Sequence, residues 1–534
     1  MKSLGACTLL LLTSAWGAAA DDNINWLLKF DAKASPQSQG WQAVGGLAAG
    51  AKIVNGALQI LDESGEDMGA FRATWTPDPS REIVVEARVR VESVKGRKGG
   101  TSIWPWTEGA PAGLLVSDGR HQEGIVLRPE KVATFLDRVA LMDGKKEFHD
   151  YRLVIHGNDM AVFVDGKLLI RGADAFWKKA ASKEAFVQFG SNSRTIRGES
   201  YWQSVRLGVR KPTSVPRTSK LKITLSEPWD IPSPELKGTG YEILHKHTRP
   251  FVHDMGRGLL LMSVAQGPDA VMEPYGVLKS TDQGKTWQPI KGMQAKSFAP
   301  QSLVRLPDGH ILGVSRWTAR YAREEGVYIG MSYRFDPKAE SFTMFESLVR
   351  VPEGQTDWLS FNRDIYTMAN GDIIASVYGS AKGGRRSMLL KSSDGGATWT
   401  HYSTLGPRPE PSVVRLPGKE MTALLRVNGW MPFEQIWSQD EGKTWTKPVY
   451  LEEGSVDPDM VYMSNGVLAC SYGRPGSNLM FSTDKGKTWT DHRTITDARG
   501  YNYTAVREVS PGRLLYIHDG GGMQALYVDV KRLD

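Results

Sequence analysis

A short pattern occurs six times in the second half of the chain and constrains the fold more than any other feature. Each copy is a turn glycine followed by a small apolar strand, and successive copies are 53, 62, 47, 48 and 46 residues apart. The glycines are Gly256, Gly309, Gly371, Gly418, Gly466 and Gly512. A period of about 48 residues with one turn motif per unit predicts four-stranded sheets repeated around an axis.

Four of the six units end in a second pattern, Ser-x-Asp-x-Gly-x-Thr-Trp. The copies are STDQGKTW (280–287), SSDGGATW (392–399), SQDEGKTW (438–445) and STDKGKTW (482–489). The Ser and Asp side chains can accept hydrogen bonds from the turn amides, Gly supplies a positive φ, and Trp can pack beneath the turn. Each box has only one reliable acid, too few for a calcium loop. We therefore interpret the boxes as structural caps of hairpins.

Four such boxes on a six-unit repeat resemble the sialidase (neuraminidase, BNR-repeat) superfamily. The resemblance covers residues 241–534 and implies a six-bladed β-propeller. Other secreted propellers carry the same boxes, so function must be argued from the remaining residues.

The first half of the chain has a different pattern. Residues 1–20 read as a cleavable signal peptide, which predicts a secreted or periplasmic protein. Short alternating segments over 22–210 predict antiparallel strands, with a tight hairpin at Asp165-Gly166. This stretch resembles concanavalin-like (laminin-G-like) β-sandwich (jelly-roll) domains. The proline-rich segment 211–240 is expected to be an interdomain linker. The fold class is thus all-β.

Composition excludes several kinds of partner. The formal net charge is +7, but the basic residues are scattered and form no run of five, so neither nucleic-acid nor membrane-surface binding is indicated. No membrane span is expected. Cys470 is alone after removal of the signal peptide, so no intrachain disulfide is expected. The histidines His245, His247 and His253 lack a third ligand at metal spacing, and neither a metal nor a cofactor is predicted.

Charged residues at strand ends form the candidate site. Glu410 begins the first strand of the fourth unit and Arg426 ends its second, so antiparallel pairing brings both to the same rim. Sialidases have a Glu followed about fifteen residues later by an Arg, and this pair is similar. Arg474, in the fifth unit, resembles the third arginine of the sialidase triad. Arg249 resembles the first, although sialidases usually read Arg-Ile-Pro where this chain reads Arg-Pro-Phe.

Three converging guanidiniums would bind a carboxylate, because their planar forks match its two oxygens. Arg363 and Asp364 open the third unit at the position that corresponds to Arg249 and Glu410, and they either line the same pocket or pair with each other. Asp457 and Asp459 open the fifth unit similarly, either at the pocket or as a cap of the strand end.

The sialidase resemblance also implies a nucleophile and an acid. Tyr503 resembles the tyrosine that attacks the anomeric carbon, with Glu410 as its base, and Tyr501 is the alternative nucleophile. A neutral phenol avoids the repulsion that a carboxylate nucleophile would meet from an acidic sugar. Asp269 lies close to the spacing of the acid/base aspartate, with Glu273 as the alternative.

These residues together predict a retaining exo-glycosidase that acts on an acidic glycan, with sialic acid as the expected sugar. A related propeller enzyme that cleaves another acidic, uronate-containing glycan by hydrolysis or elimination is an alternative, because the Arg-Ile-Pro sequence is missing. A non-catalytic glycan-binding propeller is the alternative from a different functional class. The oligomeric state is not predicted.

Overall fold

The structure is a computed structural model, and it describes most of the chain between residues 23 and 533. The described residues are 23–63, 67–95, 112–135, 138–172, 175–176, 178–192, 196–212, 220–231, 248–266, 273–290, 300–321, 324–352, 355–427, 431–454, 456–474, 476–496, 502–520 and 522–533. Their secondary structure is nearly all strand, with two short 3-10 helices, η1 (Gln37–Gln39) and η2 (Gly46–Gly50). The all-β prediction is confirmed.

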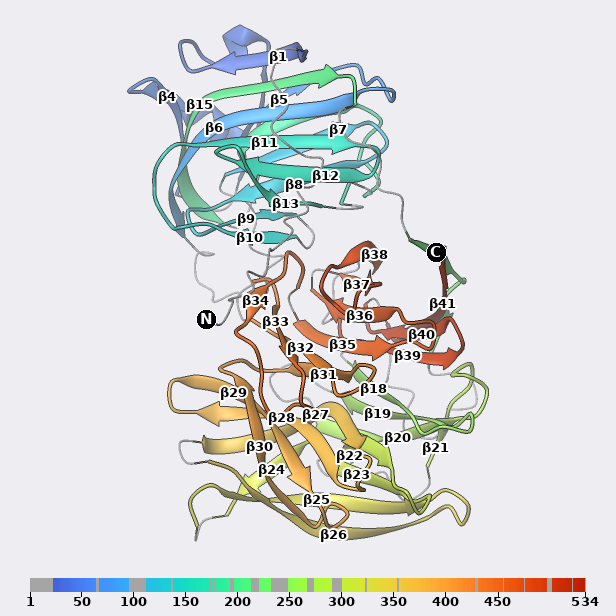
Figure 1. Ribbon diagram of the computed structural model, residues 1–534. Helices are drawn as coiled ribbons and strands as arrows, with labels where there is room; N and C mark the ends of the chain where they lie inside the picture. Colours follow the sequence, from blue (N-terminus) through green and yellow to red (C-terminus); the bar gives the residue numbers. More distant parts are fainter. Residues whose placement is uncertain are drawn as a thin grey trace, which may run out of the picture. The chain divides into compact units, whose positions relative to one another are not determined.

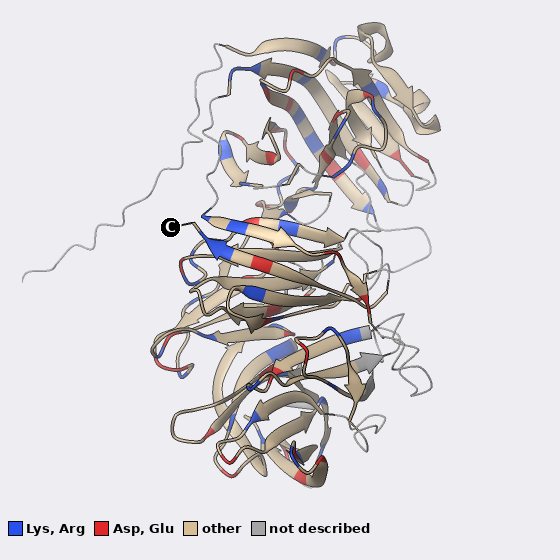
Figure 2. Ribbon diagram, turned by 90° about the vertical axis from the view of Figure 1, so that its right-hand side faces the viewer, with Lys and Arg blue, Asp and Glu red and all other residues tan. Residues whose placement is uncertain are grey.

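The chain divides into two compact units (Figure 1). Unit 1 comprises Met1–Phe135 and Ala140–Thr218, and unit 2 comprises Leu136–Val139 and Ser219–Asp534. Lys and Arg are interspersed with Asp and Glu along the strands of both units (Figure 2), as the scattered sequence positions of the basic residues predict. No helix among the described residues is long and apolar enough to cross a membrane.

Unit 1 consists of two antiparallel sheets that share one hydrophobic core. The first has the order β13 (Lys167–Ile170), β12 (Asp159–Val164), β11 (His149–His156), β6 (Glu82–Lys95), β15 (Arg197–Arg210), β4 (Ala57–Asp62) and β3 (Lys52–Val54), with β1 (Asn25–Asp31) paired to β15. The second has the order β10 (Val139–Leu141), β9 (Lys131–Thr134), β8 (Gln122–Leu127), β7 (Gly113–Asp118), β14 (Ala185–Ser191), β5 (Gly69–Thr74) and β2 (Gln42–Val44). Trp202 of the first sheet and Phe189 of the second lie in this core with ring centroids 5.1 Å apart.

The hairpin expected at Asp165-Gly166 is present. Asp165 and Gly166 have φ values of 50° and 78°, and they connect β12 to β13 as a two-residue loop between the paired residues Val164 and Lys167. Two consecutive positive φ values are the signature of a type I′ turn. The Asp-Gly dipeptide therefore determines this register locally.

Unit 2 consists of five described sheets. The first repeat forms β18 (Thr248–Asp254), β19 (Leu260–Gln266), β20 (Glu273–Ser280) and β21 (Gln288–Pro289). The second and third repeats share a nine-stranded sheet in the order β22 (Pro300–Arg305), β23 (Ile311–Ser315), β25 (Val327–Asp336), β24 (Trp317–Arg320), β27 (Gln355–Thr367), β28 (Ile373–Ala381), β29 (Gly384–Ser392), β30 (Thr398–Gly406) and β26 (Ser341–Arg350). Strand β24, which pairs with β25 and β27, and the parallel pairing of β26 with β30 join these two repeats.

The remaining three repeats form separate sheets. The fourth contains β31 (Pro411–Arg415), β32 (Met421–Leu425), β33 (Glu434–Ser438) and β34 (Val449–Tyr450), and the fifth contains β35 (Val456–Tyr462), β36 (Leu468–Gly473), β37 (Ser477–Ser482) and β38 (Thr490–Thr496). The last contains β39 (Thr504–Ser510), β40 (Arg513–His518), β41 (Gln524–Arg532), β16 (Leu221–Leu225) and β17 (Trp229–Asp230). All six repeat glycines have positive φ and stand between the first and second strands of their repeats.

The hydrophobic clusters of unit 2 connect the repeats in a closed order. Five clusters join consecutive repeats: first to second, second to third, third to fourth, fourth to fifth, and fifth to sixth. A further cluster joins the sixth repeat to the first, with Ile517 and Ala525 packed in the same core as Met262 and Trp287. Each repeat therefore buries its apolar faces against two neighbours.

Part of the segment expected as a linker is built into the last sheet. Strand β16 pairs with β41 over five residues, from Leu221–Arg532 to Leu225–Val528. The segment LKITL alternates apolar and polar residues and contains no proline, so it can pair even though its surroundings are proline-rich. The outermost strand of the last sheet thus precedes the first repeat in the chain.

All four Ser-x-Asp boxes have the predicted hydrogen bonds. In the first, Ser280 Oγ donates to Asp282 (2.8 Å) and accepts the Gly284 N–H (2.9 Å), while the Thr286 N–H donates to Asp282 (3.0 Å). The other three boxes repeat these contacts, and each box tryptophan packs against a hydrophobic cluster. The described residues contain no group of three His, Cys, Asp or Glu side chains that could hold a metal ion.

Candidate active site

Among the described residues, four of the six repeats have a non-glycine residue with positive φ within or just before the first strand. These residues are Arg363 (39°), Glu410 (45°), Asp457 (48°) and Asn502 (52°). In β27 and β35 the strand register shifts at this point, between Phe361 and Ile365 and between Val456 and Asp459. Such bulges redirect a side chain away from the regular alternation of a strand. The chain thus places charged or amide side chains of different sheets at equivalent, redirected positions.

The centre of the site is the carboxylate of Asp457. Arg249, on β18, donates to it from Nε (2.9 Å) and Nη2 (2.5 Å), which is a bidentate pair. Arg363 donates to the same carboxylate through Nη2 and lies 3.1 Å from Asp459 through Nη1. Arg249 also donates to Asn362 Oδ1 (3.3 Å). Arg249 is 1% exposed and Asp457 is completely buried.

The neighbouring charges determine the protonation states of Asp457 and Arg249. Burial alone would raise the pKa of Asp457, but the positive charges of Arg249 and Arg363 and the hydrogen bond from Arg249 outweigh burial and lower the pKa to about 2. Burial disfavours the charged form of Arg249, yet the carboxylates of Asp457 and Glu410 raise its pKa well above the usual value. Asp457 is therefore a carboxylate and Arg249 a cation at any physiological pH.

Arg249 also connects the network to the predicted catalytic residues. Its Nη2 lies 3.9 Å from Glu410 Oε1, and its guanidinium carbon lies 4.8 Å from the centroid of the Tyr503 ring. Arg474 contacts the same ring, 4.9 Å from the centroid. Glu410 accepts a hydrogen bond from Arg426 Nη1 at 2.7 Å, as the antiparallel pairing of the fourth repeat predicts. Five predicted residues of four repeats are thus brought together.

The backbone of Tyr503 is held by the hairpin that follows it. Its N–H donates to Asp519 Oδ1 (2.7 Å), and the Asp519 N–H donates back to the Tyr503 carbonyl (3.2 Å). The phenol ring is buried, with 3% exposure. The ring is therefore held through its backbone and by its contacts with the two guanidiniums.

Arg363 and Asp364 do not pair with each other. Arg363 binds Asp457 and Asp459, whereas Asp364 Oδ2 accepts the backbone N–H of Val413 at 2.7 Å. Burial, together with the nearby carboxylate of Asp459, raises the pKa of Asp364 well above its usual range. Asp364 thus joins the third repeat to the fourth. This contact supports a structural role for Asp364 in place of the substrate-binding role expected from the sequence.

Several predicted residues lie outside the described part of the site. Asp269, Tyr501, His245 and His247 are not among the described residues, and Glu273 belongs to β20 without a described side chain. The third of the histidines considered as ligands, His253, is buried. Its Nε2 lies 2.8 Å from the carbonyl of Gln301.

Sequence analysis left Asp457 open between the pocket and a strand-end cap, and it did not consider Asn362. The signal for Asp457 was its place at the start of the fifth unit, where Glu410 stands in the fourth. Asn362 precedes Arg363, and its side chain both accepts from Arg249 and donates to the Pro411 carbonyl (2.8 Å). No sequence pattern distinguishes this asparagine from a solvated turn residue.

Comparison with protein families supports the repeat. Residues 338–517 match the family described as BNR repeat-like domain. This part of the chain resembles BNR-repeat proteins. The matched region contains Glu410, Arg426, Arg474, Asp457 and Tyr503, so most of the candidate site lies within it. No curated protein matches the chain.

Solved structures show only distant similarity. A protein of unknown function from Dyadobacter fermentans is 18% identical, with 58% of this chain and 99% of that chain covered and a TM-score of 0.44. A mutant form of the NanB sialidase from Streptococcus pneumoniae is 11% identical (87% and 99% covered, TM-score 0.40), and an alpha-L-arabinanase from Penicillium chrysogenum is 14% identical (54% and 94% covered, TM-score 0.39).

Proposed function

We propose that the protein is a secreted, retaining exo-glycosidase that removes terminal sialic acid from glycoconjugates. The observation that carries the proposal is the position of Arg249, whose guanidinium lies 3.9 Å from the carboxylate of Glu410 and 4.8 Å from the ring of Tyr503. A phenol, a carboxylate and a cation from three sheets meet in one buried centre. Such a group combines a weak nucleophile with the base and positive charge that activate it.

We further propose that the six repeats are the blades of a six-bladed propeller, with a concanavalin-like sandwich before it. The closed order of hydrophobic clusters supports the propeller, as does the pairing of β16 with β41, by which a strand from before the first repeat completes the last sheet. Closure of this kind removes exposed sheet edges. In this arrangement the first strands surround the axis, and their redirected residues form the site.

In the proposed reaction, Tyr503 attacks the anomeric carbon while Glu410 takes its phenolic proton. Asp269 gives its proton to the leaving oxygen, the glycosidic bond breaks, and a glycosyl-tyrosine forms. Asp269 then removes a proton from water, the hydroxide oxygen displaces the tyrosine oxygen, and Glu410 returns the proton to Tyr503. Two displacements retain the anomeric configuration. Arg249, Arg426 and Arg474 hold the substrate carboxylate.

Asp457 favours a second candidate, a glycosidase or lyase acting on another acidic glycan such as a uronate-containing polysaccharide. Its carboxylate already forms a bidentate pair with Arg249 and also binds Arg363. A substrate carboxylate would then depend more on Arg426 and Arg474, which lie against Glu410 and Tyr503. This changes the geometry of the expected clamp and makes the identity of the sugar the point to test.

A fluorogenic sialoside assay with Tyr503→Phe tests the proposal. We expect the variant to lose about 10³-fold or more in kcat/KM, because it keeps the ring but has no attacking oxygen. Tyr527→Phe is the matched control, since Tyr527 belongs to the same repeat and its hydroxyl donates to the Gln283 carbonyl (3.2 Å), outside the site. Full turnover by Tyr503→Phe would refute the assigned chemistry. A wild-type protein that releases uronate-containing products but no sialic acid would establish the second candidate.

A further inference from the structure

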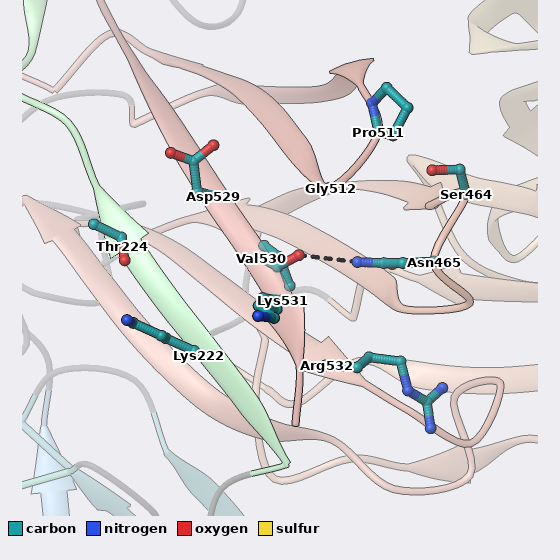
Figure 3. A pocket seen from close by; sticks show the side chains of 10 residues that line it. All are labelled: Lys222, Thr224, Ser464, Asn465, Pro511, Gly512, Asp529, Val530, Lys531 and Arg532. Atoms are coloured by element: carbon teal, nitrogen blue, oxygen red, sulfur yellow. Dashed lines mark hydrogen bonds between the residues drawn. The ribbon is translucent and has the colours of Figure 1, made fainter. Parts of the chain in front are cut away.

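Unit 2 has two adjoining hollows at the rim opposite the candidate active site, which we call the rim groove. The first hollow, of about 690 Å³, is lined by β16, β41 and the turns around Asn465 and Gly512 (Figure 3). The second, of about 370 Å³, lies between the fourth and fifth repeats. Arg532 lines both. Ser464, also in the first hollow, lies just beyond the end of β35, whereas Asp457 lies near its start, and the seven residues between them correspond to about 23 Å at strand rise.

Two lysines stand directly opposite each other in the first hollow. Lys222 of β16 pairs in register with Lys531 of β41, and both side chains are exposed. Like charges directly opposite on neighbouring strands destabilise a sheet. Among the described residues, neither ammonium has a hydrogen bond or an ion pair to an acid. The pair therefore presents two positive charges to solvent. An anion bound between the two ammonium groups would offset their mutual repulsion.

The acids beside the lysines are committed to other partners. Asp529 forms a bidentate pair with Arg513, with distances of 2.6 and 3.0 Å. Glu508 accepts hydrogen bonds from the backbone and hydroxyl of Ser464 (2.7 and 2.8 Å) and from the N–H of Gly512 (2.9 Å). Glu508 thus fixes the turns that shape the hollow, and Asp529 is paired with Arg513, so neither carboxylate pairs with Lys222 or Lys531.

The second hollow provides aromatic surface next to these charges. Trp437 and Tyr462, both half-buried, lie in its wall, together with the polar side chains of Gln439 and Lys487. Aromatic rings with a polar end suit ligands that have both an apolar face and hydroxyl groups, as sugar rings do. A chain of sugars that crosses Arg532 would contact the rings in one hollow and the lysines in the other.

We infer that the rim groove binds an anionic polysaccharide, with sugar rings against Trp437 and Tyr462 and carboxylate or sulfate groups between Lys222 and Lys531. This site is separate from the candidate active site and does not depend on the chemistry proposed for Tyr503. It would hold the enzyme on a charged glycan while the active site acts elsewhere on the same material.

Affinity electrophoresis of the full chain tests the inference, with polygalacturonate and dextran sulfate as carboxylate and sulfate probes and neutral dextran as reference. We expect Lys222→Gln/Lys531→Gln to weaken binding of at least one charged probe tenfold or more. Lys285→Gln/Lys443→Gln is the matched control, because it removes the same charge from two exposed turn lysines that line neither hollow. The control is expected to weaken binding less than threefold, and dextran should not bind with comparable affinity.

Thermal melting distinguishes specific binding of an anion between the two lysines from general electrostatic attraction to a basic protein. Without polysaccharide, Lys222→Gln should melt at a higher temperature than the wild type, because it removes the repulsion from Lys531. Dextran sulfate should raise the melting temperature of the wild type and have a smaller effect on the double variant. Equal loss of binding by the double variant and its control, or equal binding of neutral dextran, would overturn the inference. Unchanged hydrolysis of a small substrate by the double variant would show that the two sites are independent.

Discussion

The burial of Asp457 leads to a quantitative prediction about stability. Asp457→Asn keeps the size of the side chain but removes the charge that Arg249 and Arg363 share. The lowering of the pKa of Asp457 to about 2 from 3.8 corresponds to about 2 kcal/mol of native-state preference for the ionised form. Breaking a buried ion pair from one side costs about 3–5 kcal/mol, since the remaining charge is left without compensation. We therefore expect the variant to lose about 2–5 kcal/mol of unfolding free energy.

Asp529→Asn provides a control with the same chemistry at the surface. Asp529 also forms a bidentate pair with an arginine, Arg513, across adjacent strands, but the two side chains are 48% and 40% exposed. Exposed ion pairs contribute about 0–1 kcal/mol, because water and salt screen them. The two substitutions thus differ mainly in burial.

Urea unfolding of both variants, followed by tryptophan fluorescence and analysed by linear extrapolation, measures the difference. The unfolding of the two units can be separate, so the comparison uses the transition that Asp457→Asn shifts. If the two variants lose the same free energy to within about 1 kcal/mol, the buried network does not stabilise unit 2 as described. The reasoning about charge compensation at Arg249 would then be wrong.

Two further predictions follow from buried groups. Burial lowers the pKa of His253 to about 3, with a contribution from nearby arginines, and that of His518 to about 4, so both are neutral in the native state. Below about pH 6.5 the unfolded chain protonates both imidazoles, whereas the native state does not, so the free energy of unfolding decreases as the pH falls. Urea titrations should show a decrease of up to about 5 kcal/mol between about pH 6.5 and about pH 4.5. His253→Gln should make this pH dependence shallower. Gly473→Ala should prevent folding of unit 2 in circular dichroism and melting experiments, since its Cβ would overlap the carbonyl oxygen of Asn502. Gly418→Ala, with open space around its Cβ, should cost only about 1–2 kcal/mol from its positive φ; equal losses for the two glycine variants would contradict the steric argument.

Local sequence signals predicted a large part of unit 2. The repeat glycines identified the first turn of every repeat, and the Ser-x-Asp boxes identified their own hydrogen bonds. The pairing of Glu410 with Arg426 followed from a hairpin within one repeat. In each case the residues are close in sequence and the geometry of a turn or hairpin fixes their relation.

Relations between distant repeats were not predictable in the same way. The pairing of Asp457 with Arg249 spans 208 residues, and it depends on how two sheets pack. The register of β16 on β41 likewise depends on which strand edge remains open in unit 2. Asp269 and Tyr501 lie outside the described residues, so their roles as acid and alternative nucleophile stay predictions.

The positive φ values at the site connect its stability to its geometry. A non-glycine residue in this conformation costs about 1–2 kcal/mol, and glycine would avoid that cost. Arg363, Glu410, Asp457 and Asn502 nonetheless occupy the four positions. Two of these side chains, those of Arg363 and Asp457, compensate each other directly, and Glu410 binds Arg426 and approaches Arg249. Glycine would remove the strain together with the ion pairs that hold Arg249 beside Tyr503. The strained backbone and the charge network therefore require each other, and the contact of Tyr503 with the Arg249 guanidinium depends on both.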